Sequence, residues 1–122
     1  MEGCYLSDGS GLSEANAVTS LFLARLLRLM ALKEEAFFRP FYESLPLAGR
    51  SGSLKNTLKG TAAEGNLRAK TGTLERVRAL SGYATARNGR LLAFSIIVNN
   101  YAGSGGAIRQ KMERFMLELC KN

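Results

Sequence analysis

The tripeptide Lys70-Thr71-Gly72 is the part of this sequence best suited to chemistry. It lies within residues 67–74, which have the residue types of a strand. The lysine and the threonine hydroxyl suit a carboxylate, and the glycine lets a peptide backbone lie close against the strand. The triplet therefore suits an extended peptide that ends in a carboxylate. Taken alone it fits an ordinary strand and turn better, and the prediction of a site depends on a second segment.

A second polar segment, Asp8-Gly9-Ser10-Gly11-Leu12-Ser13-Glu14-Ala15-Asn16, lies far upstream. A serine can relay protons and an asparagine can hold a substrate amide, so Ser13 and Asn16 are candidate site residues. The alternative is structural. Ser13 also suits the N-cap of a helix, and Asn16 suits its first turn. Asp8 and Ser10 are expected to shape the loop.

The sequence has no histidine, which removes Ser-His-Asp and Cys-His catalysis and most zinc and iron sites. We therefore expect neither a metal nor a cofactor. Two cysteines, Cys4 and Cys120, lie near the two ends, and they could pair only if the termini meet.

The pattern along the chain predicts one α+β domain over residues 1–122, with an antiparallel sheet of about three strands packed against helices. Helices are predicted over 14–33, 34–44 and 107–121. The first is expected to be covered on most of its faces, and Pro40 is expected to kink or end the second. A helical turn is expected within 53–60. Strands are predicted over 67–74, 77–86 and 90–101, with Asn88-Gly89 as a hairpin turn and the last, near-continuously apolar run as a central strand.

A net charge of +7 is compatible with an anionic partner, and a small nucleic-acid-binding module is the alternative function that it favours. The lysines and arginines are scattered rather than clustered, and no motif has the geometry to read a groove. We therefore predict no nucleic-acid partner.

Four segments, in order, resemble one protein family. They are the segment 8–16, then Leu45-Pro46-Leu47-Ala48-Gly49-Arg50-Ser51-Gly52-Ser53-Leu54, then Ala69-Lys70-Thr71-Gly72-Thr73-Leu74, and finally Leu80-Ser81-Gly82-Tyr83. Together they are similar to the serine-type D-alanyl-D-alanine carboxypeptidases and endopeptidases of the class C low-molecular-mass penicillin-binding proteins. The resemblance implies part of a β-lactamase/transpeptidase-like fold. A related serine β-lactamase or esterase is a further alternative, because it shares the Lys-Thr-Gly strand.

The resemblance also implies roles for single residues. Ser13 would pass a proton to the leaving amine, and Asn16 would bind the substrate's acyl-side amide. Lys70 would complete the hydrogen-bonded network and add positive potential. Thr71 and Thr73 would bind the terminal carboxylate beside Gly72, and the Thr73 N–H would supply half of an oxyanion hole.

The nucleophile of the family is a serine followed three residues later by a lysine, and no Ser-x-x-Lys occurs in these 122 residues. The sequence therefore resembles a C-terminal part of the domain, which we expect to be inactive alone. Apolar surface would be left uncovered, which predicts a homo-oligomer of this part.

The intact enzyme is expected to act on peptidoglycan peptides that end in D-Ala-D-Ala and to bind β-lactams. A periplasmic or extracytoplasmic location follows from that substrate. No signal peptide is visible in these residues.

Overall fold

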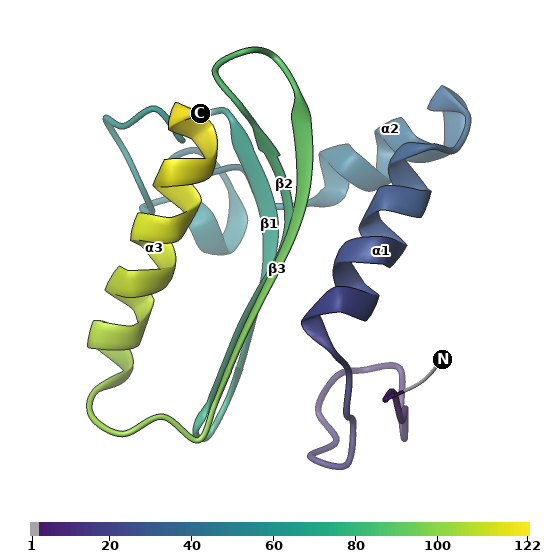
Figure 1. Ribbon diagram of the computed structural model, residues 1–122, viewed down its shortest axis with the longest axis vertical. Helices are drawn as coiled ribbons and strands as arrows, with labels where there is room; N and C mark the ends of the chain where they lie inside the picture. Colours follow the sequence, from purple (N-terminus) through teal and green to yellow (C-terminus); the bar gives the residue numbers. More distant parts are fainter. Residues whose placement is uncertain (1–2) are drawn as a thin grey trace.

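The computed structural model describes residues 3–122 and contains one antiparallel sheet between helices. The elements, in chain order, are α1 (Ser20–Ala31), α2 (Glu35–Ser44), the 3₁₀ turn η1 (Gly52–Leu54), β1 (Leu67–Leu74), β2 (Val77–Thr85), β3 (Leu91–Asn99) and α3 (Gly105–Lys121). The strand order is β1-β2-β3, so β2 is central. The predicted α+β class and three-stranded sheet are confirmed (Figure 1).

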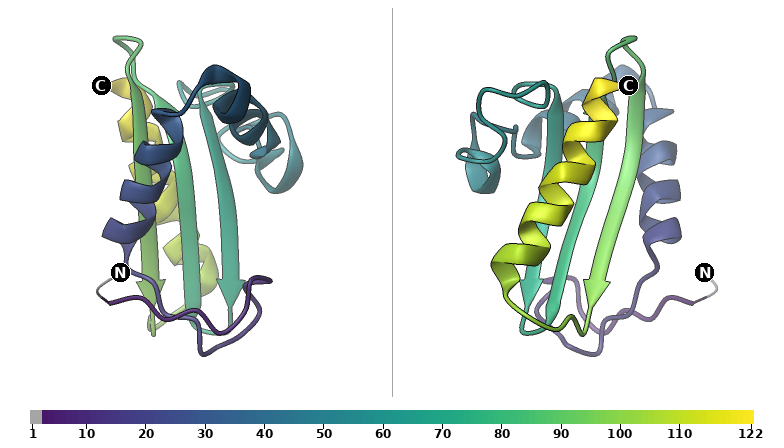
Figure 2. Two further views of the ribbon diagram at one scale, coloured as in Figure 1. Left: turned by 90° about the vertical axis from the view of Figure 1, so that its right-hand side faces the viewer. Right: turned by 60° about the vertical axis from the view of Figure 1, so that its left-hand side comes forward.

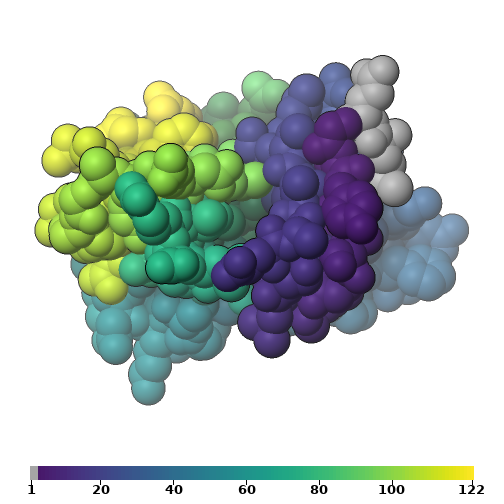
Figure 3. All heavy atoms as spheres, turned by 90° about the horizontal axis from the view of Figure 1, so that it is seen from below, coloured from purple at the N-terminus to yellow at the C-terminus, as the bar shows by residue number. Residues whose placement is uncertain are grey.

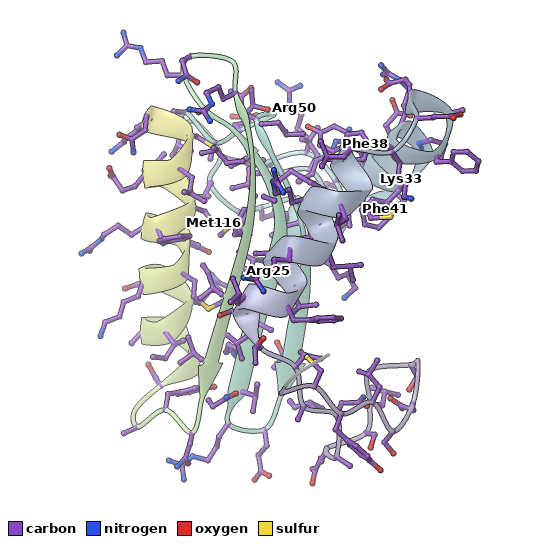
Figure 4. All side chains as sticks on the ribbon, turned by 45° about the vertical axis from the view of Figure 1, so that its right-hand side comes forward. Arg25, Lys33, Phe38, Phe41, Arg50 and Met116 are labelled. Atoms are coloured by element: carbon purple, nitrogen blue, oxygen red, sulfur yellow. The ribbon has the colours of Figure 1, made fainter. Side chains whose placement is uncertain are left out.

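Helices cover both faces of the sheet: α3 lies on one face, and α1 on the other (Figures 1 and 2). Successive side chains of a strand point to opposite faces. Leu80 and Ala84 of β2 and Phe94 of β3 therefore face α3, where they form one cluster with buried residues of that helix, including Met116. The domain core lies between the sheet and α3 (Figure 4).

The opposite face has a smaller aromatic cluster around Tyr83 of β2, whose exposed fraction is 1%. Phe38 and Phe41 of α2 approach its ring edge-on, with centroids 5.4 and 6.4 Å away. Its hydroxyl donates to the Leu27 carbonyl of α1 at 2.6 Å, and burial raises the pKa of Tyr83 to about 12. Tyr83 thus ties both N-terminal helices to the sheet.

The first helix begins later than predicted, which corrects the expectation of a helix over 14–33. Tyr5 and Ala17 exchange two backbone hydrogen bonds, at 2.7 and 2.8 Å, and this bridge keeps Ala17 out of the helix. The helix begins at Ser20, and the hydroxyl of Thr19 accepts from the Phe22 N–H at 3.0 Å. Ser13 is therefore not its N-cap.

The prediction that this helix is covered on most faces is also wrong for the part of the chain that the structure describes. Leu27 is its single buried residue. Four leucines of α1 and its C-terminus are exposed: Leu21, Leu26, Leu29 and Leu32. No helix within residues 3–122 has the length and apolar character that crossing a membrane requires.

The third strand lies at an edge, whereas its apolar run predicted a central position. Continuous apolarity reports that both faces of a strand are covered, which α1 and α3 do here. The predicted Asn88-Gly89 turn does join β2 to β3, with Gly89 at φ +82°.

The remaining differences are small. Pro40 lies inside α2 and does not end it. A helical turn was expected within 53–60, whereas the short η1 begins at Gly52 and ends at Leu54. The last helix begins two residues early, at Gly105, because the Ser104 side chain accepts from the Ala107 N–H at 3.2 Å.

Candidate functional site

The outer edge of β1 carries the candidate site. Asn66 accepts a hydrogen bond from the Thr85 N–H at 2.7 Å, which makes this a hydrogen-bonded pair in the β1–β2 register. Such pairs alternate along an antiparallel ladder. The backbone groups of even-numbered β1 residues therefore face β2, and those of odd-numbered residues face away from it.

The N-terminal half of this edge is closed by the segment before η1. The Ala48 N–H donates to the Leu67 carbonyl at 2.9 Å, and the Ala69 N–H donates to the Pro46 carbonyl at 3.0 Å. Beyond this bridge, the N–H groups of Thr71 and Thr73 have no backbone partner within residues 3–122. We call residues 70–73 of β1 the open edge.

The ammonium group of Lys70 lies at the open edge. Its side chain is exposed, and Nζ donates to the Thr71 carbonyl oxygen at 2.6 Å. That oxygen points away from β2, so the bond brings the positive charge beside the unpaired backbone groups. The predicted strand that carries this cation is therefore an edge strand of the sheet.

Ser53 is a site residue that the sequence analysis did not single out. The hydroxyl of Thr71 donates to the Ser53 hydroxyl at 3.2 Å. The turn that places Ser53 needs Gly52, which has φ +54° and whose added Cβ would lie 2.9 Å from Pro46. The segment 45–54 thus closes one half of the edge and supplies a hydroxyl to the other.

Arg78 of β2 is a second residue that the sequence analysis missed. It pairs with Thr73 in the strand register, and its Nη1 donates to the Thr73 hydroxyl at 3.1 Å. Arg78, Ser53, Thr71 and Thr73 line one cavity of about 200 Å³ between the sheet and α3. The two-residue turn after Leu74 was the available signal, because it sets the Thr73–Arg78 pairing.

The upstream segment forms a loop held together by Asn16 and Asp8. The Asn16 side-chain oxygen accepts from the N–H groups of Ser7 and Asp8, at 2.8 and 3.3 Å, and its amide donates to the Asp8 carboxylate at 2.6 Å. Hydrogen bonds from the Ser10 hydroxyl and then from Asn16 hold the pKa of Asp8 below its usual value. Asn16 therefore has a structural role in this loop.

Ser13 lies in the same loop, half-buried, and its hydroxyl accepts from the Ala15 N–H at 3.2 Å. The loop lies at the end of the sheet where β1 turns into β2, close to the open edge (Figures 1 and 3). Within residues 3–122, no hydrogen bond joins Ser13 or Asn16 to Lys70, and neither residue lines the cavity. Their predicted catalytic roles stay predictions.

The described residues 3–122 contain no group of three or more acidic or cysteine side chains placed to hold a metal ion. Cys4 and Cys120 are both free thiols, and burial raises the pKa of Cys120.

Residues 1–119 match the model of the D-Ala-D-Ala carboxypeptidase 3 (S13) family. Carboxypeptidase DacB of Mycolicibacterium smegmatis is 44% identical over 107 residues, which are 84% of this chain and 23% of that protein. A D-alanyl-D-alanine carboxypeptidase of Actinomadura sp. (strain R39) is 45% identical over 106 residues, 83% of this chain and 19% of that protein.

A solved structure of a penicillin-binding protein is also similar to this chain. Penicillin binding protein 4 of Haemophilus influenzae, in complex with a novel β-lactam, matches with a TM-score of 0.85 and 30% identity, over 98% of this chain and 29% of that one. The chain thus spans less than a third of each of these three proteins. Because the family model covers nearly all of its residues, the chain belongs to the D-Ala-D-Ala carboxypeptidase 3 (S13) family of serine-type carboxypeptidases.

Proposed function

We propose that the open edge of β1 binds the D-Ala-D-Ala end of a peptidoglycan peptide as an added strand. The observation that carries this proposal is that the N–H groups of Thr71 and Thr73, beside the Lys70 ammonium, have no backbone partner in the described part of the chain. Main-chain pairing would supply affinity, while the cation and the hydroxyls would select a terminal carboxylate. The exposed Gly72 leaves room for the peptide backbone.

The chain then forms one wall of an active site that hydrolyses such peptides through an acyl-serine. In this proposal the Thr73 N–H helps to stabilise the oxyanion, and Lys70 contributes positive potential. The loop of Asp8 and Asn16 holds Ser13 near the open edge. The intact enzyme would act on peptidoglycan outside the cytoplasmic membrane. The β-lactam complex of the Haemophilus relative supports β-lactams as a second ligand class.

The acyl-forming serine is not provided by a Ser-x-x-Lys motif within these 122 residues. We expect the purified chain to bind peptide without hydrolysing it and to remain unlabelled by a fluorescent penicillin. A covalent fluorescent band on a denaturing gel, removed by excess unlabelled penicillin, would contradict this assignment.

The binding step can be tested without turnover. We expect diacetyl-L-Lys-D-Ala-D-Ala, added to the ¹⁵N-labelled chain, to shift the amide resonances of Thr71 and Thr73 more than that of Ala69, whose N–H is already bonded. Replacing Lys70→Met should weaken binding about tenfold, the order expected for one charge-assisted hydrogen bond. Lys111→Met is the matched control, because it removes an exposed lysine on α3.

Two results would contradict the binding proposal. One is the absence of shifts along the open edge while the spectrum shows a folded chain. The other is equal binding of the peptide built from L-Ala-L-Ala, because the D configuration of the two C-terminal residues would then not be recognised.

We also propose that the purified chain self-associates through the exposed leucines of α1. Leu21, Leu29 and Leu32 are exposed by 57%, 58% and 68%, and apolar surface of this kind favours contact with a second copy. Light scattering at micromolar concentration should give a mass above that of one chain. Leu29→Glu should restore the monomer, and a monomeric parent chain would refute the proposal.

A further inference from the structure

The cavity behind the open edge is lined by hydroxyl residues and by two arginines, and the arginines have no part in the proposed peptide pairing. The residues that line it include two arginines, Arg78 and Arg109, one carboxylate residue, Glu113, and four hydroxyl residues, Ser53, Thr57, Thr71 and Thr73. Donors of this kind suit an anion with several acceptor oxygens. The cavity lies on the α3 face of the sheet, directly behind the hydroxyls of the open edge.

Arg78 is the most confined of these groups. Its Nη1 donates to Thr73 Oγ1 at 3.1 Å, whereas its Nε–H group is buried and has no hydrogen-bond partner within residues 3–122. Gly105, the first residue of α3, lies so close that an added Cβ would be 2.7 Å from Nη2. The guanidinium is therefore held between Thr73 and the start of α3, with an unused donor.

The bond from Arg78 fixes the role of the Thr73 hydroxyl. A guanidinium can only donate, so Thr73 Oγ1 must act as the acceptor in this contact. The hydroxyl hydrogen of Thr73 is then left for another acceptor. Thr73 is exposed, so this hydrogen is available to a ligand at the open edge.

The two arginines that line the cavity carry one more charge than the single carboxylate beside them, that of Glu113. Arg109 pairs with Glu113 of the same helix, with Nε and Oε1 3.3 Å apart. Arg78 has no carboxylate partner within residues 3–122. One positive charge therefore remains next to Thr73, in a partly enclosed space where it is less screened than on an open surface.

We propose that Arg78 is the positioning residue for carboxylate recognition: it holds Thr73 Oγ1 so that the hydroxyl donates to the terminal carboxylate of the bound peptide, and it supplies the compensating charge. This inference rests on the proposed function. It adds a residue that acts through Thr73 on the anionic end of the substrate, and so predicts a preference for a free carboxylate over a neutral end.

The test compares diacetyl-L-Lys-D-Ala-D-Ala with the same peptide as its C-terminal amide. The two ligands differ only at the group that Arg78 is proposed to recognise. We expect the parent chain to bind the acid about tenfold more tightly than the amide. Arg78→Gln should lower affinity for the acid to that for the amide, and leave affinity for the amide unchanged. Arg78→Lys keeps the charge and should recover part of the preference.

Arg76→Gln is the matched control. Arg76 lies in the turn that precedes β2, and its Nη2 donates to the Tyr101 carbonyl at 3.2 Å. Its removal changes the net charge by the same amount, and should keep the preference for the acid.

Two further readouts distinguish recognition from a purely structural role. In the unmodified chain, the Nε–H resonance of Arg78 should shift on addition of the acid and not of the amide. Thr73→Val should abolish the preference to the same extent as Arg78→Gln, and the double variant should lose nothing more, because the two side chains act as one unit.

The outcomes separate the two proposals. If neither peptide shifts the open edge, the proposed function fails and this inference fails with it. If the acid is preferred and Arg78→Gln keeps that preference, the peptide site stands and the role of Arg78 is refuted. An Nε–H resonance that is unchanged by the acid also refutes the role of Arg78, whatever the stability of the variants.

Discussion

The two halves of β1 differ in what covers their outer edge. At the N-terminal half, Pro46 and Ala48 pair with the backbone of Leu67 and Ala69. At the C-terminal half, the odd-numbered residues Thr71 and Thr73 present their N–H groups to no backbone partner within residues 3–122. The strand is one continuous element of the sheet, so the difference comes from where the bridging segment turns away. A closed edge therefore continues directly into an open edge, which is the edge at which we propose that a peptide pairs.

The largest loss of stability is expected at Gly82, one of two glycines that lie in different halves of the β1–β2 ladder. An added Cβ at Gly82, opposite Ala69 in the closed half, would lie 2.0 Å from the Arg68 carbonyl oxygen. Gly82→Ala should lower the free energy of unfolding by about 3–4 kcal/mol, because the two backbones must move apart.

Gly72→Ala provides the matched comparison in the open half. Its added Cβ would lie 3.5 Å from that of Ala79, an ordinary contact. We expect a change in unfolding free energy below about 1 kcal/mol, with weaker peptide binding. Urea denaturation of both variants measures the difference. Equal destabilisation would show that the close backbone approach at Gly82 does not exclude a side chain there.

A smaller effect is expected from Tyr83, which packs beside the closed half. Its folded-state pKa of about 12 lies above the value near 10 of an unfolded tyrosine. The fold therefore favours the neutral phenol: this contribution to stability is complete below about pH 10 and is lost as the pH rises through about 12. Urea denaturation from pH 9 to 12 should show this decline.

Tyr83→Phe removes the hydrogen bond to Leu27 and should cost about 1–2 kcal/mol at neutral pH. The variant should also show a weaker decline in stability at high pH than the parent chain. An identical pH dependence in the two proteins would mean that the buried phenol is not its source.

The strands could be predicted from the sequence because their signals are local. The apolar run of β3 and the Asn88-Gly89 turn indicated the second hairpin, and the Lys-Thr-Gly triplet indicated β1. The first helix began seven residues after the predicted N-cap at Ser13, since the bridge between Tyr5 and Ala17 is a tertiary contact. A capping residue alone does not indicate that a distant backbone bridge will delay the start of the helix.

The candidate site was predicted only in the part that lies on one strand. Lys70 was singled out from its motif, and the structure places its ammonium at the outer edge of β1. Arg78 and Ser53 reach the same place through strand register and through a turn that depends on Gly52. These are relations between segments, so the residue types of either segment do not indicate them.

Amide hydrogen exchange of the folded chain, with and without diacetyl-L-Lys-D-Ala-D-Ala, tests the contrast between the two halves of β1 most directly. The N–H of Ala69 should exchange slowly in both samples because Pro46 already accepts it. The N–H groups of Thr71 and Thr73 should exchange fast in the free chain and slow in the presence of the peptide. Slow exchange at Thr71 and Thr73 before any peptide is added, or no slowing by it, would contradict the account.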